Sequence, residues 1–312
     1  MRSCRLGASG LEVSVLSLGS WRTCERITRD QGLAVMVAAR EEGITFLDDA
    51  RYDDETGTAP IPSGYSEVVF GELFGGAGHK RSTVTVANKL WWEFWPDQSA
   101  EQELDASLAR MGFDRVDLIY SSTVPDDLPM EVVVESVGGL IETGRARQWG
   151  IVNWSGEALE RAGDLCEAAG VPQPCAAQLP YSLVHRDWVE GGPMRRALER
   201  TGASVVASSV MAGGALTGKY GRGGSGRLSG QRAVAAGGAL AASARELAGL
   251  AEEWGTSAAA LAIAFALDAP SVASVLFGAT SPEQVTQNVA ALRLADGLAD
   301  HQWERLRAIG AG

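Results

Sequence analysis

Short apolar runs alternate with amphipathic stretches along the chain. The runs have the length of β-strands, and in the stretches between them apolar residues recur every three or four positions, as on one face of a helix. We predict strands at residues 13–18, 45–47, 83–87, 116–120, 146–151, 175–179, 204–208 and 272–277. We predict helices at residues 28–40, 67–74, 100–110, 130–141, 157–168, 194–199, 282–292 and 300–309, with Thr28 or Asp30 capping the first.

This order of elements favours one α/β domain over residues 1–312, a (β/α)8 or TIM barrel. An open doubly wound sheet is the alternative, and it would ordinarily carry a Gly-x-Gly-x-x-Gly turn after its first strand. Here the first predicted strand leads instead into Gly19, Ser20 and Trp21. The barrel is therefore the preferred interpretation.

The longest irregular segment is residues 212–238, which is rich in glycine. Loops of this length are either functional or disordered. Because the segment follows the seventh predicted strand, a lid over a ligand and a solvated insertion are both open interpretations.

Acidic residues outnumber basic ones by 39 to 27, which gives a net charge of −12. Nucleic acids and anionic membranes attract basic surfaces, so we expect neither as a partner. The histidines and cysteines are few and scattered, which argues against a metal site and a disulfide scaffold. No signal peptide is apparent, and residues 254–282 divide into a short helix and a strand, so we expect a cytoplasmic protein. The sequence leaves the oligomeric state open, and a homo-oligomer is one possibility.

Polar residues follow most of the predicted strands. In a parallel barrel these strand ends meet at one mouth, where barrel enzymes carry their active sites. The residues concerned are Asp48, Asp49, Asn88, Lys89, Ser121, Ser122, Asn153, Gln178, Ser208 and Ser209. The whole set of polar strand ends indicates an active site more strongly than any single residue in it.

Asp48 and Lys89 stand at the ends of neighbouring predicted strands. The axes of neighbouring strands lie about 4.8 Å apart, so the carboxylate and the ammonium can come into contact. A buried ion pair contributes little to stability, which favours a functional role for this pair over a structural one. Tyr52 follows at the start of the next loop, where it is either part of a site or a surface tyrosine. A nearby ammonium lowers the pKa of a phenol. The three residues could supply a proton to a carbonyl oxygen. No side chain donates hydride, so a reduction needs a cofactor.

Several motifs resemble those of the aldo-keto reductase family and occur in the family's order. They are TFLDDARY, SEVVFGELF, VANKLWW, GRARQWGIVNWS, QLPYSLVHR, MAGGALTGKY and LFGATSPEQVTQN. Three stretches, YSLVHR, GALTGKY and GATSPEQ, are most similar to the branch of potassium channel beta subunits. The resemblance implies a (β/α)8 barrel with an N-terminal hairpin and a C-terminal helical extension, which binds NADPH and reduces carbonyl groups.

By position, the resemblance assigns three members of the family's catalytic tetrad to Asp48, Tyr52 and Lys89. The fourth member, usually a histidine, falls on Ser122, whose hydroxyl can still donate one hydrogen bond. Tyr52 lies one residue closer to the aspartate than is usual, and an extra stretch, residues 53–64, follows it. Tyr65 is a weaker alternative for the tetrad tyrosine.

The resemblance also implies a set of cofactor contacts, with no metal. They are Gly19, Ser20, Trp21, Asp48, Asn153, Gln178, Ser208, Ser209, Met211, Gly213, Lys219, Arg227, Gly278, Thr280, Gln284, Gln287 and Asn288. Val152 and Ser208 replace a serine and an aromatic ring of the nicotinamide pocket, and Gln284 replaces an arginine that some branches direct at the 2′-phosphate. Arg227 is a substitute source of that charge. We expect NADPH or NADP, with NAD as the alternative.

Trp91, Trp92, Phe94 and Trp95 cluster just after Lys89. Large rings bury much apolar surface, so the cluster predicts a broad apolar pocket for a bulky hydrophobic ketone. The alternative is that these rings pack the loop itself. The high alanine and glycine content is typical of actinomycete proteins, and a polyketide side-chain ketoreductase is one candidate. A regulatory or scaffolding subunit that holds the cofactor with little catalysis is the second.

Overall fold

Eight parallel strands close into a barrel in this computed structural model, which describes residues 1–218 and 238–310. The neighbours follow the order β10-β3-β4-β5-β6-β7-β8-β9, and each adjacent pair is parallel. The strands are β3 (Leu16–Gly19), β4 (Phe46–Asp48), β5 (Thr85–Leu90), β6 (Val116–Ser121), β7 (Ala146–Val152), β8 (Ala176–Pro180), β9 (Ser204–Ser208) and β10 (Val272–Phe277). The predicted (β/α)8 barrel is thus confirmed, because the sheet closes and leaves no open doubly wound edge.

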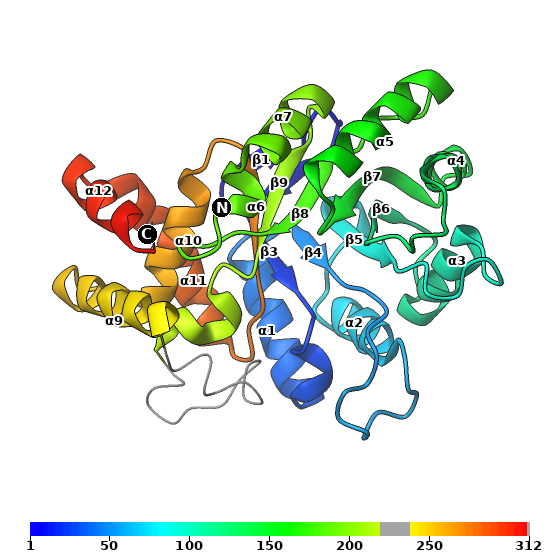
Figure 1. Ribbon diagram of the computed structural model, residues 1–312. Coiled ribbons are helices and arrows are strands. Elements are labelled where there is room, and N and C mark those ends of the chain that lie inside the picture. The colour runs from blue at the N-terminus through cyan, green and yellow to red at the C-terminus, as the bar shows by residue number, and fades with distance from the viewer. Residues whose placement is uncertain (219–237, 311–312) are drawn as a thin grey trace.

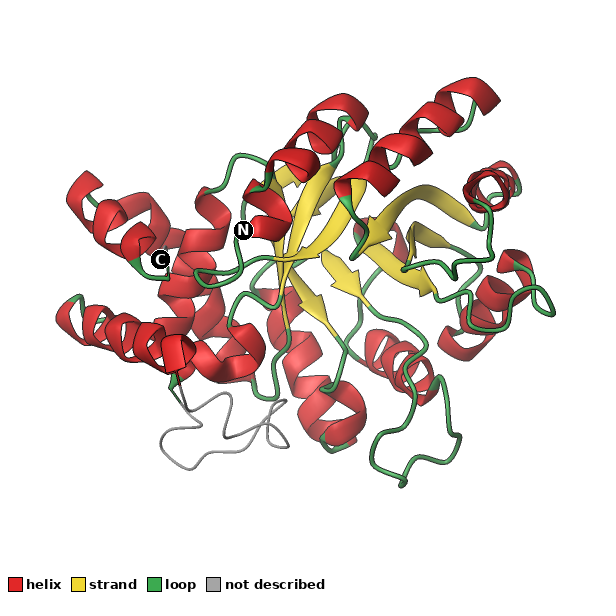
Figure 2. Ribbon diagram, viewed as in Figure 1, coloured by secondary structure: helices red, strands yellow, loops and turns green. Residues whose placement is uncertain are grey.

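Helices surround the strands on the outside of the barrel (Figure 1, Figure 2). They are α1 (Arg29–Glu41), α2 (Tyr65–Gly76), α3 (Ala100–Met111), α4 (Met130–Glu142), α5 (Gly156–Ala169), α6 (Asp187–Glu190), α7 (Gly192–Thr201), α9 (Gly238–Glu253), α10 (Ala258–Asp268), α11 (Pro282–Gly297) and α12 (Asp300–Ala308). Short 3-10 turns within the described residues are η1 (Cys24–Arg26), η2 (Arg81–Thr83) and η3 (Ala212–Thr217). Thr28, not Asp30, caps α1, in a capping box with Gln31.

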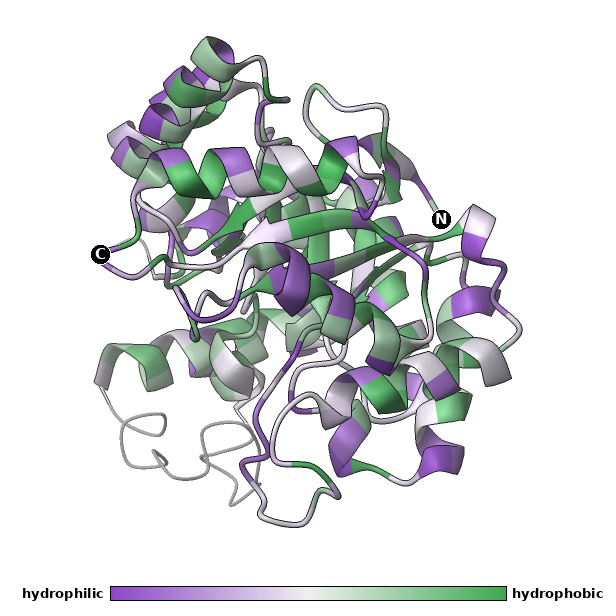
Figure 3. Ribbon diagram, turned by 90° about the vertical axis from the view of Figure 1, so that its right-hand side faces the viewer, coloured by the Kyte–Doolittle hydropathy of each residue, from purple (hydrophilic) through white to green (hydrophobic). Residues whose placement is uncertain are grey.

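The core has two layers, one outside the strands and one inside the barrel. In Figure 3 the central strands are mostly hydrophobic, whereas hydrophilic segments lie on the helices and loops around them. All six residues of β5 and all six of β6 are buried, because both faces of a parallel barrel strand are covered. The inner layer includes Phe46, Leu118 and Val206.

A hairpin formed by β1 (Ser3–Arg5) and β2 (Glu12–Ser14) closes the end of the barrel at which the strands begin. Leu6, Leu11 and Val13 join the inner apolar layer. Gly7 lies so close to the Cys175 and Gly202 carbonyls that an added Cβ would overlap both. The open mouth is therefore at the opposite end, where the strands finish.

The strand predicted at residues 13–18 is wrong as one element, because it divides between hairpin and barrel. The Ser14 side chain causes the break: its hydroxyl donates to the Leu16 carbonyl at 2.6 Å and accepts the Thr45 and Phe46 amides. Helix α9 was not predicted; it and α12 pack against α10. Residues 254–282 do contain the expected helix and strand, α10 and β10. Within the described residues no helix is long and apolar enough to cross a membrane.

Candidate active site

Alternation along the strands directs the predicted tetrad residues into the barrel mouth. Phe46, Ala87 and Leu118 belong to the inner apolar layer. Side chains two positions further along a strand share the same face. Asp48 and Lys89 therefore point inward above that layer. Ser122 continues the same alternation just past the end of β6.

Asp48, Lys89 and Tyr52 meet in this mouth. Lys89 Nζ lies 2.5 Å from Asp48 Oδ1 and 3.3 Å from the Tyr52 hydroxyl. Asp48 is 2% exposed and Lys89 4% exposed, whereas Tyr52 is half-buried. The predicted juxtaposition of phenol, ammonium and carboxylate is thus present.

Gln178 orients Asp48 from the far side of the barrel. Its side-chain amide donates to Asp48 Oδ2 at 2.9 Å, while Lys89 occupies Oδ1. Both carboxylate oxygens of Asp48 therefore accept a hydrogen bond. Gln178 therefore supports the tetrad through its contact with Asp48.

Burial dominates the acid strength of Tyr52. It raises the pKa of the phenol above its ordinary value, and Lys89 offsets only part of that rise. The predicted net lowering of this pKa is therefore wrong, although Lys89 acts in the predicted direction. Burial by itself lowers the pKa of Lys89, but Asp48 and Tyr52 together raise it above the usual value. Lys89 accordingly stays protonated beside Tyr52.

Ser122 is buried one strand away from Lys89. Its amide donates to the Leu90 carbonyl at 2.9 Å, and its own carbonyl accepts the Trp154 indole N–H at 2.7 Å. These contacts fix the backbone through which the Ser122 hydroxyl is presented at the mouth. Tyr65, the weaker tetrad alternative, instead accepts a hydrogen bond from Arg29 at 3.0 Å at the start of α2.

Tyr52 stands between two indole rings, with Trp21 6.4 Å and Trp91 6.0 Å from its ring centre. The three rings border a cavity of about 460 Å³, which we call the tyrosine pocket. Its lining residues are Trp21, Arg22, Glu25, Arg26, Arg51, Tyr52, Asp53, Glu55, Trp91 and Glu93. Most of this wall is charged.

The four-ring apolar pocket predicted after Lys89 is therefore not formed. Trp91 lines the tyrosine pocket, but Trp92 is buried and its indole N–H donates to Ser121 Oγ at 2.9 Å. Trp95 packs against the outer core. Phe94 is 54% exposed, under the Arg51 guanidinium. The rings separate because Trp92 and Trp95 fill the loop, which was the alternative interpretation.

A second and larger cavity, of about 1130 Å³, runs from the mouth toward α11. It contains eight of the predicted cofactor contacts, namely Ser209, Met211, Gly213, Gly278, Thr280, Gln284, Gln287 and Asn288. Gly213 and Gly214 have φ of 66° and 90° and offer backbone without side chains, which lets a ligand approach closely. Hydroxyl and amide groups at the start of α11 suit a phosphate or a ribose. The residues present thus fit an extended dinucleotide.

Residues 15–311 match the sequence profile of the Aldo/keto reductase family. The chain belongs to the aldo/keto reductase family. It is also 29% identical over 325 aligned positions to a probable voltage-gated potassium channel subunit beta from Oryza sativa subsp. japonica, covering 99% of this chain and 96% of that protein. This aldo/keto reductase is an NAD(P)H-dependent oxidoreductase, and its family acts on small-molecule carbonyl compounds.

The other predicted cofactor contacts of this aldo/keto reductase lie around the mouth. Gly19 and Ser208 end β3 and β9. Asn153 is exposed just past β7 with φ of 59°. Ser20 donates to the Asp49 carboxylate, and Trp21 lines the tyrosine pocket. Lys219 and Arg227 fall outside the described residues.

Sequence reasoning missed Arg22 and Arg26, which line both the tyrosine pocket and the larger cavity. The signal was present, because two arginines four residues apart follow Trp21 at the end of the first barrel strand. They also meet Glu55 from the extra stretch after Tyr52.

Asp49 is a second buried carboxyl group at the mouth, 0% exposed. Its Oδ1 accepts from Ser20, whereas Oδ2 has no hydrogen-bond partner among the described residues. Burial and the nearby Glu67 carboxylate raise the pKa of Asp49 well above its ordinary value. From the sequence, Asp49 is predicted only to be one of the polar residues that follow the strands.

Proposed function

We propose that this aldo/keto reductase uses NADPH to reduce a ketone on a bulky small molecule to a secondary alcohol. The observation that carries the proposal is the contact of the Tyr52 hydroxyl with Lys89, which Asp48 holds. Tyr52 lines the tyrosine pocket, which shares Arg22 and Arg26 with the larger cavity. The tyrosine pocket is assigned to the substrate and the larger cavity to the cofactor.

When bound, NADPH supplies the hydride for the carbonyl carbon. The Tyr52 hydroxyl gives its proton to the carbonyl oxygen as negative charge develops there. Lys89 stabilises the phenolate that Tyr52 becomes, and Asp48 keeps Lys89 charged and in place. Ser122 contributes a hydrogen bond to the carbonyl oxygen. A raised phenol pKa suits this role, since it keeps Tyr52 protonated until the substrate oxygen becomes basic.

The preference for NADPH rests on polar groups around α11. Thr280, Gln284 and Asn288 lie in the part of the larger cavity that the resemblance assigns to the adenosine end. Gln284 Oε1 accepts the Thr280 amide at 2.9 Å and leaves its NH₂ group as a donor. Arg227 would add the positive charge that a 2′-phosphate favours.

Three rings of the tyrosine pocket support the proposed substrate class. Trp21, Tyr52 and Trp91 offer surfaces on which a flat ring can pack. The charged remainder of the wall favours a ring that also carries polar groups. A polyketide side-chain ketone, such as the substrate of a ketoreductase in mithramycin biosynthesis, fits this description.

The test follows NADPH oxidation in single turnovers with a panel of polycyclic and aryl ketones. We expect at least one ketone to oxidise bound NADPH and to yield the secondary alcohol, identified by mass spectrometry. A protein that binds NADPH and leaves it reduced with every ketone would contradict the proposal.

The second candidate is a cofactor-holding regulatory subunit. It is favoured by the likeness to a probable channel beta subunit and by a serine, Ser208, at the position of the nicotinamide-stacking ring. NADPH binding without turnover in the same experiment would support this second function. A homo-oligomer is compatible with both.

A further inference from the structure

The tyrosine pocket is lined by many charged side chains of both signs. Among the residues that the structure describes, three guanidiniums, of Arg22, Arg26 and Arg51, face four carboxylates on this wall, so these lining residues sum to a formal charge of −1. Arg51 pairs with Glu93 and lies 3.7 Å from Asp53. The arginines of this wall therefore each have a carboxylate of the protein beside them.

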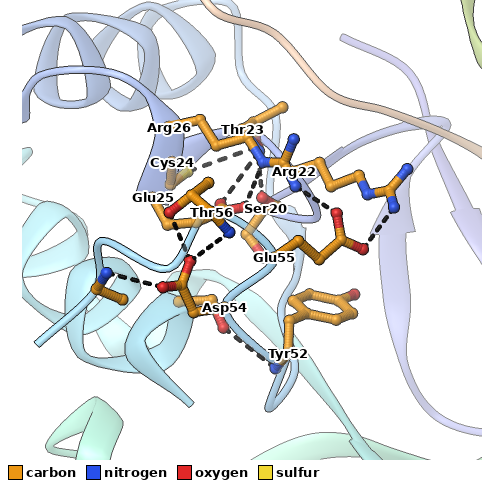
Figure 4. Close-up of polar contacts among 12 residues, drawn as sticks. Ser20, Arg22, Thr23, Cys24, Glu25, Arg26, Tyr52, Asp54, Glu55 and Thr56 are labelled. Atoms are coloured by element: carbon orange, nitrogen blue, oxygen red, sulfur yellow. Dashed lines mark hydrogen bonds and ion pairs between the residues drawn. The ribbon is translucent and has the colours of Figure 1, made fainter. Parts of the chain in front are cut away.

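Glu55 makes the central contact, because one carboxylate bridges two arginines. Its Oε1 lies 2.5 Å from an Arg22 nitrogen and its Oε2 lies 2.5 Å from an Arg26 nitrogen. Figure 4 shows both contacts above the Tyr52 ring. Arg22 hydrogen bonds hold the pKa of Glu55 below its ordinary value, so the bridge is ionic at neutral pH. Glu55 thus occupies the place that a carboxylate of a ligand would take.

The segment that carries Glu55 is folded around Asp54. The Asp54 carboxylate accepts the Thr56 amide and the Ala59 amide, both at 2.8 Å. The Thr56 hydroxyl also donates to this carboxylate at 2.6 Å, and that bond, together with the two amide bonds, lowers the pKa of Asp54 to about 2. The Gly64 amide donates to the Tyr52 carbonyl at 2.9 Å, which ties the two ends of the segment together. Glu55 is therefore presented to the arginines by a defined turn, directly after Tyr52.

We propose that Glu55 determines substrate specificity by occupying Arg22 and Arg26, so that the tyrosine pocket accepts neutral carbonyl compounds and rejects those that bear a carboxylate. This inference rests on the proposed carbonyl reduction at Tyr52. A ligand carboxylate that enters the pocket meets described lining residues whose formal charges sum to −1, and it must displace Glu55 to reach Arg22 or Arg26. Unfavourable charge placement of this kind discriminates between ligands of the same shape.

The test compares two probes of similar size, 4-carboxybenzaldehyde and its methyl ester, which differ in charge. The measured quantity is the ratio of kcat/KM for the acid to kcat/KM for the ester at pH 7. The wild-type protein is expected to favour the ester. Glu55→Gln keeps the side-chain shape and removes the carboxylate charge that faces both arginines, while Glu25 stays 3.2 Å from Arg26. The ratio should therefore rise about tenfold. The rise should shrink at high ionic strength.

Two matched variants separate the bridge from a general change of charge. Glu93→Gln removes one charge from the same pocket, but Arg51 keeps Asp53 nearby, so its ratio should rise less than that of Glu55→Gln. Glu131→Gln removes a charge from an exposed pair with Arg161 on the outer helices and should leave the ratio unchanged.

Each outcome has one meaning. If Glu55→Gln raises the ratio more than either matched variant, the assignment holds. If the ester is reduced but the ratio does not move, or moves equally in Glu93→Gln, the Glu55 assignment is overturned while carbonyl reduction stands. If NADPH is bound and neither probe nor any ketone of the panel is reduced, the proposed function fails, and the Glu55 assignment with it.

Discussion

The Asp48–Lys89 pair and the Glu55 bridge both join carboxylate to cation at 2.5 Å in the same mouth. Their surroundings differ. The side chains of the first pair are 3% and 4% exposed, whereas Arg22, Arg26 and Glu55 are 25%, 33% and 43% exposed. Removing one partner of a buried pair leaves an uncompensated charge, but water screens the survivor of an exposed pair. Contact distance therefore says little about energy until burial is known.

The largest effect is expected from Lys89→Met. This change leaves Asp48 charged and buried, so the free energy of unfolding should fall by about 3–5 kcal/mol, and turnover should be lost. Urea unfolding and NADPH oxidation measure the two effects. The double variant Asp48→Asn with Lys89→Met should recover most of the stability but no activity. Equal stability of Lys89→Met and the wild type would show that the pair is not isolated from water.

Tyr52→Phe should separate chemistry from stability within the buried cluster. It removes the proton donor but keeps the ring between Trp21 and Trp91, so kcat should fall by about 10²–10⁴-fold. Cofactor binding, followed by quenching of protein fluorescence, should stay within about twofold of the wild type, as expected for a residue that acts in the chemical step. Unchanged turnover would remove Tyr52 from the mechanism.

Asp49→Asn tests, through the pH dependence of stability, how strongly burial affects a carboxyl group at the mouth. The folded pKa of Asp49 lies above its ordinary value of 3.8, so the folded wild type binds more protons than the unfolded chain above that pH. Wild-type stability should therefore fall relative to Asp49→Asn as pH rises from about 4 toward the raised pKa, with a limiting slope of about 1.4 kcal/mol for each increase of one in pH. Chemical unfolding at a series of pH values measures the difference. A difference that is constant with pH would contradict the raised pKa.

The smallest change in stability is expected from Glu55→Gln. Its ion pairs are half-exposed, so the free energy of unfolding should change by less than about 1 kcal/mol, and less still in high salt. Thermal unfolding at low and high salt checks this expectation. A loss comparable to that of Lys89→Met would mean that the bridge supports the fold.

Much of the barrel and of the tetrad could be predicted because both follow from strand alternation. Polar residues at the ends of apolar strands must gather at one mouth, and Asp48, Lys89 and Gln178 do so. The hairpin break at Val15 could not be predicted, since it depends on long-range hydrogen bonds to Ser14.

The character of the tyrosine pocket was harder to predict than its place. Trp92 and Trp95 resemble pocket residues in the sequence but fill the loop, because burial depends on tertiary packing that local sequence does not encode. The direction of the Tyr52 pKa depends on the balance of burial against one ammonium, which only the structure provides. Glu55 and Arg26 are 29 residues apart, and nothing local pairs them.

The hairpin that closes the barrel floor has a consequence for how the chain assembles. The hairpin is synthesised before the strands that it contacts, yet the hydrogen bonds that hold it to those strands form last. The Gly7 amide bonds to Ser204 across 197 positions, and the Ser14 carbonyl accepts from Ser274 across 260. Such distant contacts close slowly because much chain must be ordered first. The closed end of the barrel is therefore completed only after the final strand has been synthesised. Until then the apolar side chains of Leu6, Leu11 and Val13 lack part of the inner layer against which they pack.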